Sequence, residues 1–350
     1  MPKRLSIMSA PSLKEIAKIV GVSATTVSDV LNGKAAMKRI SAATAEKVLK
    51  AAKELNYRPN QLAKSLVSSK SHTIGLMYQD LSYSAAETVT AAVFPEIEKK
   101  GYTAFISTSQ WSATRERREI EAFMDRQIEG VISVPLTTNR EFYRNLIPTL
   151  PLVQICDWLD AVDLPCVVLD AGAAVRELVA HLHQLGHRKI GFIGVRGDSM
   201  QLKWRYESFL QACTDFGISM DRHLVEFGRN TDAQSAAAAG IHMLSRNNAP
   251  TAILGVSDPV AIQIMEGLLG TRYAGTVAIA GIGDTIGSGS GLIQLTSVSE
   301  PLAEIGKTAA KMLMAKLDGK EIPKNQVFVK GTLKPRFSTL GLSRKRQTPK

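Results

Sequence analysis

The sequence predicts an all-α helix-turn-helix head at the N-terminus, followed by a two-lobed α/β body with parallel sheets. Short helical patterns, with apolar residues recurring at helical spacing, occupy about the first sixty residues. From His72 onward, short apolar strands alternate with longer helices, which is the pattern of parallel sheets with right-handed crossovers. Six or more such units exceed what one core comfortably holds, so we expect two lobes.

The head begins with two helices joined by a tight turn. Residues 13–20 (LKEIAKIV) place apolar side chains at i, i+3, i+4 and i+7. A glycine then breaks the helix, and Ser23 is a suitable N-cap for a second helix over residues 24–32. Two helices joined by a short glycine-bearing turn form a helix-turn-helix. A third helix, from the Ser41 cap to about Asn56, can close a small core.

A short segment separates the head from the body. Pro59 stops the third helix, and Asn60 can cap a new helix over residues 61–66 (QLAKSL). The polar residues 68–71 are typical of a linker. A helix this short, with too few apolar residues for a core of its own, is marginal in isolation.

Strands and helices alternate through the body. Strands are expected at residues 73–78, 102–107, 130–134, 152–156, 189–193, 252–256 and 277–282, and helices at 87–100, 116–127, 174–185, 204–216, 260–268 and 301–317. Because such folds bind ligands beyond the carboxyl ends of their strands, we expect a ligand crevice there.

The charge of the chain is unevenly divided. The formal net charge is +11, of which residues 1–72, with 13 basic and 4 acidic side chains, carry +9. Residues 330–350 contain 7 basic and no acidic side chains, whereas the part between them has a net charge of −5. A compact basic head on an acidic body indicates a polyanion partner for the head alone. The alternative is a solvated basic segment that serves only solubility.

Several classes of protein are disfavoured. The longest apolar runs, such as Thr251–Val256, are far shorter than the ~20 residues of a membrane span, and the polar N-terminus lacks a signal peptide. Cys156, Cys166 and Cys213 are odd in number and lack CxxC spacing, which argues against disulfides and zinc. We therefore expect a cytoplasmic protein without a membrane partner.

Enzyme and metal motifs are also missing. The glycine-rich residues 281–291 (GIGDTIGSGSG) lack GxGxxG spacing and open no helix, so a loop is expected there. His181, His183 and His187 cluster without a carboxylate at ligand spacing, and no fourth metal ligand is evident. There is no GxSxG or HExxH motif. We expect no catalytic residues, no metal and no cofactor.

Motifs along the whole chain are similar to one family. LKEIAKIVGVSATTVSDVLNG and KVLKAAKELNYRPNQLAKSL closely resemble the DNA-binding head and hinge of the lactose-repressor (LacI/GalR) family of bacterial transcription regulators. HLHQLGHRKIGFIG (181–194), PTAILGVSDPVAI (250–262) and VAIAGIGD followed by LTSVSEPLAEIG (277–306) resemble its body, and the resemblance covers about residues 12–340. It implies a periplasmic-binding-protein-like body that binds a small effector. It also implies a homodimeric repressor that binds a pseudo-palindromic double-stranded DNA operator.

The resemblance implies four parts of the chain. These are a helix-turn-helix DNA-binding head (1–58), a hinge helix and linker (59–72), an effector-binding and dimerisation domain (73–342) and a basic tail (343–350). Within the body, the chain is expected to cross between the lobes near residues 170 and 298. The tail has no heptad repeat, so we expect a dimer rather than a tetramer, and a solvated, disordered end.

The DNA contacts follow from the family's pattern. By resemblance, Ala24, Thr25 and Asp29 stand at the base-reading positions of the recognition helix. Asp29 departs from the family's usual arginine, and a carboxylate can accept from cytosine but cannot bind guanine bidentately, so the operator sequence is open. Leu66 would be an apolar wedge in the minor groove with Ala63 beside it, or else a cap on the core of the body. Further DNA-contact candidates are Ser23, Thr26, Ser28, Asn32, Lys34, Lys38, Arg39, Tyr57 and Asn60.

Effector contacts are implied in the same way. Arg205 matches the family's effector-clamping arginine, and Asp258 in the Ser257-Asp258 pair could accept from ligand hydroxyls. Asp284 and Glu300 would border the crevice from one lobe, and Asp80 and Tyr83 from the other. Ser257 and Gly283 replace residues common in the family, and Trp158 or Trp204 could stack on a sugar ring. Carbohydrates, sugar acids and sugar phosphates all fit these residue types.

Two other functions remain open at this point. A periplasmic-type sugar-binding protein shares the two-lobed body, although the basic head and the lack of a signal peptide disfavour it. An enzyme of the same α/β architecture is a further alternative, but the sequence offers no residues that would carry catalysis.

Overall fold

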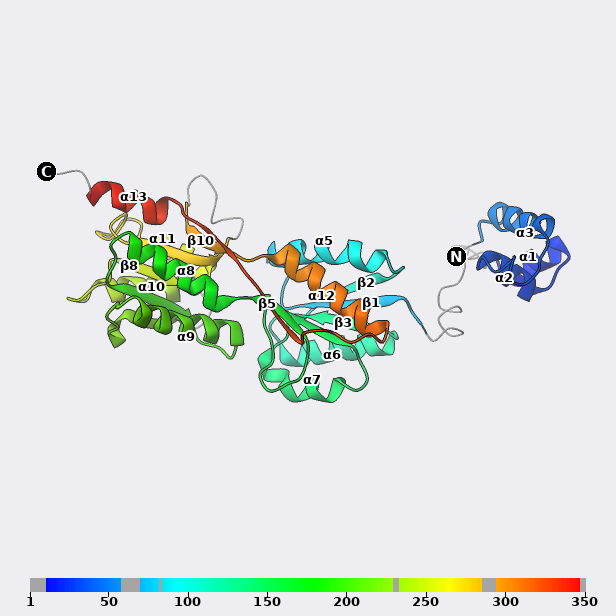
Figure 1. Ribbon diagram of the computed structural model, residues 1–350, viewed down its shortest axis with the longest axis horizontal. Helices are drawn as coiled ribbons and strands as arrows, with labels where there is room; N and C mark the ends of the chain where they lie inside the picture. Colours follow the sequence, from blue (N-terminus) through cyan, green and yellow to red (C-terminus); the bar gives the residue numbers. More distant parts are fainter. Residues whose placement is uncertain (1–10, 58–69, 82–83, 229–232, 285–293, 347–350) are drawn as a thin grey trace, which may run out of the picture. The chain divides into compact units, whose positions relative to one another are not determined.

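A computed structural model describes residues 11–57, 70–81, 84–228, 233–284 and 294–346 (Figure 1). The chain divides into two compact units, Met1–Ser71 and His72–Lys350. The first contains the helical head and the second the α/β body, so the predicted fold class is confirmed.

The head consists of three helices, α1 (Leu13–Val20), α2 (Ala24–Leu31) and α3 (Ala42–Glu54). Each begins at a serine N-cap, because a serine side chain can accept from the otherwise unpaired N–H groups of the first turn. Gly21 ends α1 with a φ of +75°, a left-handed conformation that glycine adopts without strain. Ile16, Val27 and Val48, one from each helix, are completely buried at the centre of the head.

Lobe 1 of the body is built on a six-stranded parallel sheet in the order β11-β5-β4-β3-β1-β2. In Figure 1, α5 and α12 lie over one face of this sheet and α6 and α7 over the other. Its elements are β1 (Thr73–Tyr78), α5 (Ser84–Glu98), β2 (Thr103–Thr108), α6 (Ala113–Asp125), β3 (Gly130–Ser133), η1 (Thr137–Asn139), α7 (Arg140–Leu146), β4 (Leu152–Ile155), β5 (Cys166–Leu169), α12 (Leu302–Leu317) and β11 (Gln326–Val329).

Lobe 2 has a sheet in the order β12-β10-β9-β8-β6-β7, in which only the β10–β12 pair is antiparallel. Helix α8 packs against α9, and α10 packs against α11. Its elements are α8 (Ala171–Gln184), β6 (Ile190–Val195), α9 (Met200–Asp215), η2 (Arg222–Leu224), β7 (Val225–Gly228), α10 (Ala233–Leu244), β8 (Ala252–Gly255), α11 (Asp258–Leu268), β9 (Ala278–Gly283), β10 (Thr296–Ser299), β12 (Thr332–Lys334) and α13 (Phe337–Arg346).

The two sheets repeat one topology. In each, the second strand lies at one edge and the third strand pairs on the other side of the first, so the order of the strands reverses beside the first strand. Ligands of open parallel sheets bind at such a reversal, beyond the carboxyl ends of the strands. The fold therefore gives each lobe one ligand-facing edge.

The chain crosses between the lobes three times. Two crossings follow β5 and β10, at about the predicted positions, and a third joins β11 in lobe 1 to β12 in lobe 2. The sequence prediction did not include this third crossing, because β11 and β12 are short and largely exposed and show no clear apolar pattern.

The C-terminal region differs from the predicted solvated tail. Helix α13 continues through Arg346, beyond the point at which the basic tail was expected to begin. Buried Thr339 anchors α13 to lobe 2, because its hydroxyl lies 2.9 Å from His181 Nε2 and 2.7 Å from Thr296 Oγ1. The neighbouring Ser338 hydroxyl also donates to the carbonyl of Ile279 at 2.6 Å. Polar anchors of this kind leave no periodic apolar signal, which is why the helix was missed. Among the described residues, no helix is both long and apolar enough to cross a membrane.

Candidate functional site

The surface of α2 carries the predicted DNA-contacting residues of the head. Val27 and Val30 turn one face of this helix into the core, so the opposite face is available to a partner. The Ser23 hydroxyl caps the helix by accepting from the N–H of Thr26 at 3.0 Å. The candidates on α2 and its cap are exposed or half-buried: Ser23, Ala24, Thr25, Thr26, Ser28 and Asp29.

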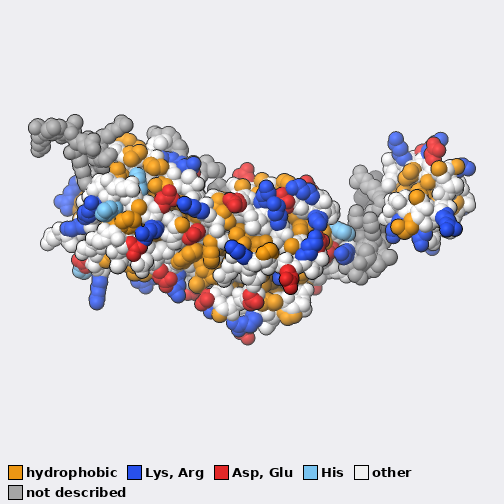
Figure 2. Space-filling view, viewed as in Figure 1, with side chains coloured by type: hydrophobic (Ala, Val, Ile, Leu, Met, Phe, Trp, Pro, Cys, Tyr) orange, Lys and Arg blue, Asp and Glu red, His pale blue; other side chains and the backbone are white. Residues whose placement is uncertain are grey.

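Four polar and basic candidates follow α2, and all are exposed: Asn32, Lys34, Lys38 and Arg39. The Asn32 side chain donates to the carbonyl of Ser28 at 2.8 Å and so fastens the end of the helix. Basic side chains are spread over the visible face of the head, with few acidic ones between them (Figure 2). Such a surface suits the phosphates of a nucleic acid, whereas the half-buried Asp29 is a local exception.

The hinge candidates are only partly covered by the structure. Tyr57 is half-buried and packs against the core of the head, so its ring has a structural role. Asn60, Ala63 and Leu66, with the predicted hinge helix, lie outside the described residues.

A cavity of about 1190 Å³ lies in the body and is lined by residues of both lobes. Lobe 1 supplies residues after its strands, including Gln79 and Asp80 after β1. Lobe 2 supplies residues of α9 and the loop after β8, and the crossing after β10 adds Glu300. The cavity therefore lies at the predicted carboxyl edges of the strands. Asp80, Arg205, Ser257, Asp284 and Glu300 line it, whereas Tyr83 lies outside the described residues.

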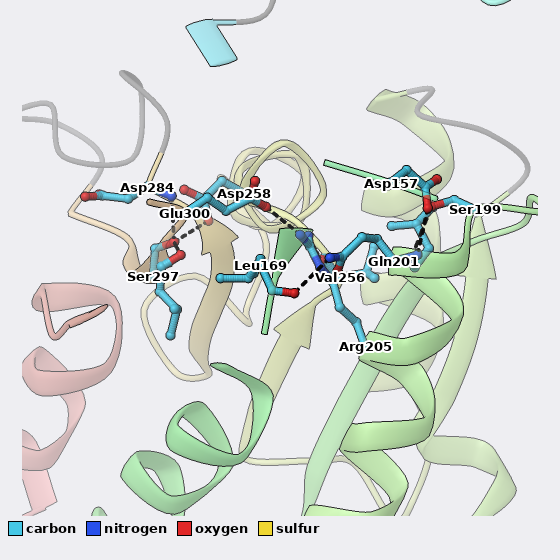
Figure 3. Close-up of polar contacts among 12 residues, drawn as sticks. Asp157, Leu169, Ser199, Gln201, Arg205, Val256, Asp258, Asp284, Ser297 and Glu300 are labelled. Carbon is cyan, nitrogen blue, oxygen red and sulfur yellow. Dashed lines mark hydrogen bonds and ion pairs between the residues drawn. The ribbon is translucent and has the colours of Figure 1, made fainter. Parts of the chain in front are cut away.

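Arg205 and Glu300 form an ion pair in the wall of the cavity. The Arg205 Nη2 lies 2.5 Å from Glu300 Oε1, and its Nη1 donates to the carbonyl of Val256 at 3.0 Å (Figure 3). Only 6% of Arg205 is exposed. Its Nε is buried and makes no hydrogen bond with any described residue. The buried Nε–H of Arg205 is therefore a donor that an occupant of the cavity could use.

Two polar residues that the sequence prediction missed lie beside Arg205. The Asp157 carboxylate follows β4 in lobe 1 and accepts from the N–H of Gln201 in α9 at 3.1 Å. Gln201 Nε2 donates to the carbonyl of Leu169 at 2.9 Å, whereas its buried Oε1 has no partner within the described chain. These bonds join the two lobes (Figure 3). Burial raises the pKa of Asp157, while hydrogen bonds from Ser199 and from backbone N–H groups oppose the rise.

Asp258 lies behind the wall of the cavity. Its side chain is completely buried at the start of α11 and is not part of the cavity wall. The Ser297 hydroxyl of the adjoining strand β10 donates to its Oδ1 at 2.6 Å (Figure 3). This carboxylate therefore joins α11 to the sheet behind the cavity, and its predicted contact with a ligand stays a prediction.

Asp284 lines the cavity and has a cationic neighbour. Its Oδ1 lies 2.5 Å from Arg336 Nη2, and its N–H donates to the Ser297 hydroxyl at 3.0 Å. The φ of Asp284 is +50°, a left-handed conformation that asparagine and aspartate tolerate better than most residues. Its carboxylate is thus held in place by Arg336, which follows the third crossing.

The aromatic residues of the cavity also differ from the prediction. Trp158 and Trp204 pack edge-to-face at 5.8 Å, Trp204 meets Phe328 of β11 at 5.0 Å, and neither tryptophan lines the cavity. They pack lobe 1 against lobe 2 instead. Trp111 lines the cavity and is 55% exposed, and Tyr78 does so with its hydroxyl 2.8 Å from that of Thr90. Burial raises the pKa of Tyr78 to about 12, so it keeps its proton.

The histidines have structural partners. His187 Nδ1 lies 2.8 Å from the hydroxyl of Thr251, and His181 contacts Thr339 as described above. In the described parts of the chain, no group of three or more His, Cys, Asp or Glu side chains could hold a metal ion.

Two family models match the chain. Residues 12–60 match "Bacterial regulatory proteins, lacI family", and residues 179–339 match "Periplasmic binding protein-like domain". The HTH-type transcriptional regulator RegA of Clostridium saccharobutylicum is 27% identical over 337 residues, which span 95% of this chain and 100% of RegA. The ribose operon repressor of Haemophilus influenzae is 26% identical over 309 residues, spanning 87% and 92% of the two chains.

Solved structures have the same fold. The lac repressor dimer bound to operator and the anti-inducer ONPF has a TM-score of 0.83 at 24% identity, covering 95% of this chain and 99% of that one. The complex of the transcriptional regulator CelR with cellobiose has a TM-score of 0.69 at 24% identity, covering 94% and 99%.

The helix-turn-helix head and the two-lobed body with a cavity at its strand ends define a DNA-binding transcription regulator with a periplasmic-binding-like domain. The matched relatives are transcriptional regulators and repressors. The chain belongs to the LacI family of bacterial transcription regulators, as its motifs indicated.

Proposed function

We propose that this regulator is a homodimeric repressor that binds a pseudo-palindromic operator and responds to a small carbohydrate-derived effector in the cavity of the body. In this proposal residues 1–58 bind DNA, residues 59–72 form a hinge, and residues 73–342 bind the effector and dimerise. The observation that carries the proposal is the cavity, whose wall contains residues of both lobes and the ion pair between Arg205 and Glu300.

On DNA, α2 enters the major groove of each half-site. Ala24, Thr25 and Asp29 face base edges, and the exposed Lys34, Lys38 and Arg39 contact phosphates. The further proposed contacts are Ser23, Thr26, Ser28, Asn32, Tyr57 and Asn60, with Ala63 and Leu66 in the minor groove. A two-fold symmetric dimer requires two matching half-sites, which is why the operator should be pseudo-palindromic.

The effector acts through the relation between the lobes. An occupant of the cavity touches groups of both lobes, so it favours one arrangement of the lobes over another. The start of the body, near residues 73–95, then shifts, and the hinge helix loses its support. A coupling of about 1–3 kcal/mol is enough to change operator affinity roughly 5- to 150-fold.

The test selects binding sites from a random double-stranded DNA library, with the full chain and with a variant that lacks residues 1–71. We expect the full chain to enrich one pseudo-palindromic motif. The truncated chain should enrich none and still bind sugars with unchanged affinity by calorimetry. Enrichment of an asymmetric single site would contradict the dimer. Failure of the full chain to enrich any motif would favour a sugar-binding protein without a role on DNA.

A further inference from the structure

The charges around the cavity point to one class of effector, an inference that rests on the effector function proposed above. Among the described residues that line the cavity, the only cation is Arg205, whereas the acids are Asp80, Glu87, Asp157, Asp284, Glu300 and Glu304. Residues 82–83 and 285–293, which follow lining residues along the chain, contain no charged side chain. We propose that the cavity selects an uncharged polyhydroxylated ligand, such as a neutral sugar, and rejects sugar acids, sugar phosphates and amines.

An anionic ligand is disfavoured because the positive charge of Arg205 is already neutralised. Glu300 contacts Nη2 of Arg205 at 2.5 Å, and the carbonyl of Val256 contacts Nη1 at 3.0 Å. A carboxylate or phosphate bound to Arg205 would have to share the guanidinium with Glu300 and the Val256 carbonyl. It would also bring its own charge close to that of Glu300, in a wall where 17% of the Glu300 side chain is exposed and water screens poorly.

A cationic ligand is disfavoured because the inner carboxylates already have partners. The Asp157 carboxylate accepts from the N–H of Gln201 at 3.1 Å and from that of Trp158 at 2.9 Å. Asp284 is paired with Arg336 at 2.5 Å. The acids Glu87 and Glu304 are exposed in the first turns of α5 and α12, where the helix dipole favours a negative charge. An amine would therefore have to break an existing pair or remain at the solvated rim.

Two buried polar atoms still need a partner. Arg205 Nε is a donor and Gln201 Oε1 is an acceptor, and neither has a hydrogen-bond partner among the residues that the structure describes. Arg205 is 6% exposed and Gln201 is 4% exposed, and both line the cavity. Because a hydroxyl group donates one hydrogen bond and accepts others, hydroxyls satisfy both atoms without adding charge. A carboxylate or phosphate could satisfy only the donor, and an ammonium group only the acceptor.

The rest of the wall suits the carbon skeleton of a sugar. Small apolar side chains of α5 line the cavity together with Val134, Leu202 and Ile282. Trp111 adds a large aromatic ring at its edge. Apolar walls with a few convergent polar groups are typical of sites for small ligands.

The experiment compares ligands that differ only in charge. The full-length protein is titrated by calorimetry, at constant pH and ionic strength, with glucose, gluconate, glucose 6-phosphate and glucosamine. Equivalent series start from galactose, ribose and cellobiose. We expect the tightest ligand to be a neutral sugar, and its acid, phosphate and amino derivatives to bind at least about tenfold more weakly. A charged derivative that binds more tightly than its neutral parent would overturn the proposal.

A substitution tests the role assigned to Glu300. Glu300→Gln keeps the shape of the side chain but frees the charge of Arg205, so the affinity ratio of the sugar acid to the neutral sugar should rise at least about tenfold. Glu321→Gln, at an exposed acid outside the cavity wall, is the matched control and should leave the ratio unchanged. An unchanged ratio in Glu300→Gln would contradict the proposal.

The same titrations distinguish failure of the proposed effector function from failure of the proposed selection of a neutral ligand. If no member of any series, charged or neutral, bound the full-length protein, the effector function itself would be contradicted. Tight binding of a sugar acid, phosphate or amine would leave that function intact and overturn only the selection of a neutral ligand.

Discussion

Arg205 shows how one residue can connect the two lobes. It extends from α9 of lobe 2 and ends between the carbonyl of Val256 and the carboxylate of Glu300, at the crossing that leads to lobe 1. Because Arg205 lines the cavity and its buried Nε–H has no partner among the described residues, it is the side chain on which ligand binding should depend most.

The first prediction concerns Arg205→Ala. Removing charge-assisted hydrogen bonds worth about 1.5–3 kcal/mol should weaken the binding of the tightest neutral sugar roughly 10- to 150-fold. The affinity for the operator without sugar should stay unchanged, because the head is a separate compact unit. Calorimetry measures the sugar and fluorescence anisotropy the DNA. A variant that still responds normally to the sugar would remove Arg205 from the proposed site.

The second prediction concerns Glu116, a carboxyl completely buried in lobe 1. Its oxygens accept from Asn139, from the N–H of Leu136 and from the hydroxyl of Tyr143, at 2.5–2.9 Å. Burial nevertheless raises the pKa of Glu116, so the folded protein binds this proton more tightly than the unfolded chain. The contribution of Glu116 to stability is therefore complete below the unfolded pKa and is lost as the pH rises through the folded pKa.

Urea unfolding at several pH values between 4.5 and 7 measures this effect. The free energy of unfolding of Glu116→Gln, relative to the parent protein, should rise with pH. Glu119→Gln on the same helix is the control with the opposite sign. Hydrogen bonds from Arg118 and Ser107 lower the pKa of Glu119, so its contribution is lost as the pH falls. Equal pH dependence of Glu116→Gln and the parent protein would contradict the assigned shift.

Among the elements, α2 combines the packing of the head with the proposed recognition surface in eight residues. Val27 and Val30 bury one face, Ser23 caps the start, and Asn32 fastens the end, which leaves the remaining positions to contact a partner. Asp29 is partly exposed on that surface, where a negative charge is unfavourable beside phosphates.

The third prediction concerns Asp29→Arg. An arginine can bind guanine bidentately, so the selected DNA motif should change to guanine at one position in each half-site, with a discrimination of about 1–3 kcal/mol. Glu46→Arg, at an exposed position of α3, makes the same change of charge. It should raise the affinity for DNA of any sequence without altering the selected motif. An unaltered motif in Asp29→Arg would show that this position does not read bases.

At the scale of the whole molecule, edge strands of both sheets carry exposed apolar side chains. Strand β2 ends the sheet of lobe 1 and carries Phe105 and Ile106, which are 53% and 42% exposed. Strand β7 ends the sheet of lobe 2 and carries Phe227, which is 37% exposed. Exposed apolar edge strands favour association, so they are suitable surfaces for the proposed dimer.

The fourth prediction follows from this surface. Phe105→Glu would bury a charge in the dimer interface, so the dissociation constant of the dimer should rise at least about tenfold in analytical ultracentrifugation. Phe337→Glu, at a 69% exposed position on α13, is the control and should leave the dimer intact. A dimer of unchanged affinity in Phe105→Glu would place the interface away from β2.

Much of the architecture could be predicted from local patterns. The spacing of apolar residues located α1, the Ser23 and Ser41 caps marked the starts of α2 and α3, and the apolar run of β1 coincides with the observed strand. These signals are encoded within a few neighbouring residues, because caps and periodic faces depend on local geometry. The weak strands β11 and β12 were missed because exposed edge segments need no apolar pattern.

For the candidate site, too, some features could be predicted from the sequence and others depend on tertiary contacts. Through its resemblance to the family, the sequence by itself indicated a DNA-binding regulator and placed Arg205 and Glu300 at the crevice, and both residues line the observed cavity. Only the tertiary structure decided that Asp258 lies behind the cavity wall, that Trp158 and Trp204 pack the lobes together, and that Asp157 and Gln201 join the site. Whether a polar side chain faces a ligand or a buried partner depends on residues distant in the chain, such as Ser297 opposite Asp258, and no local pattern contains that information.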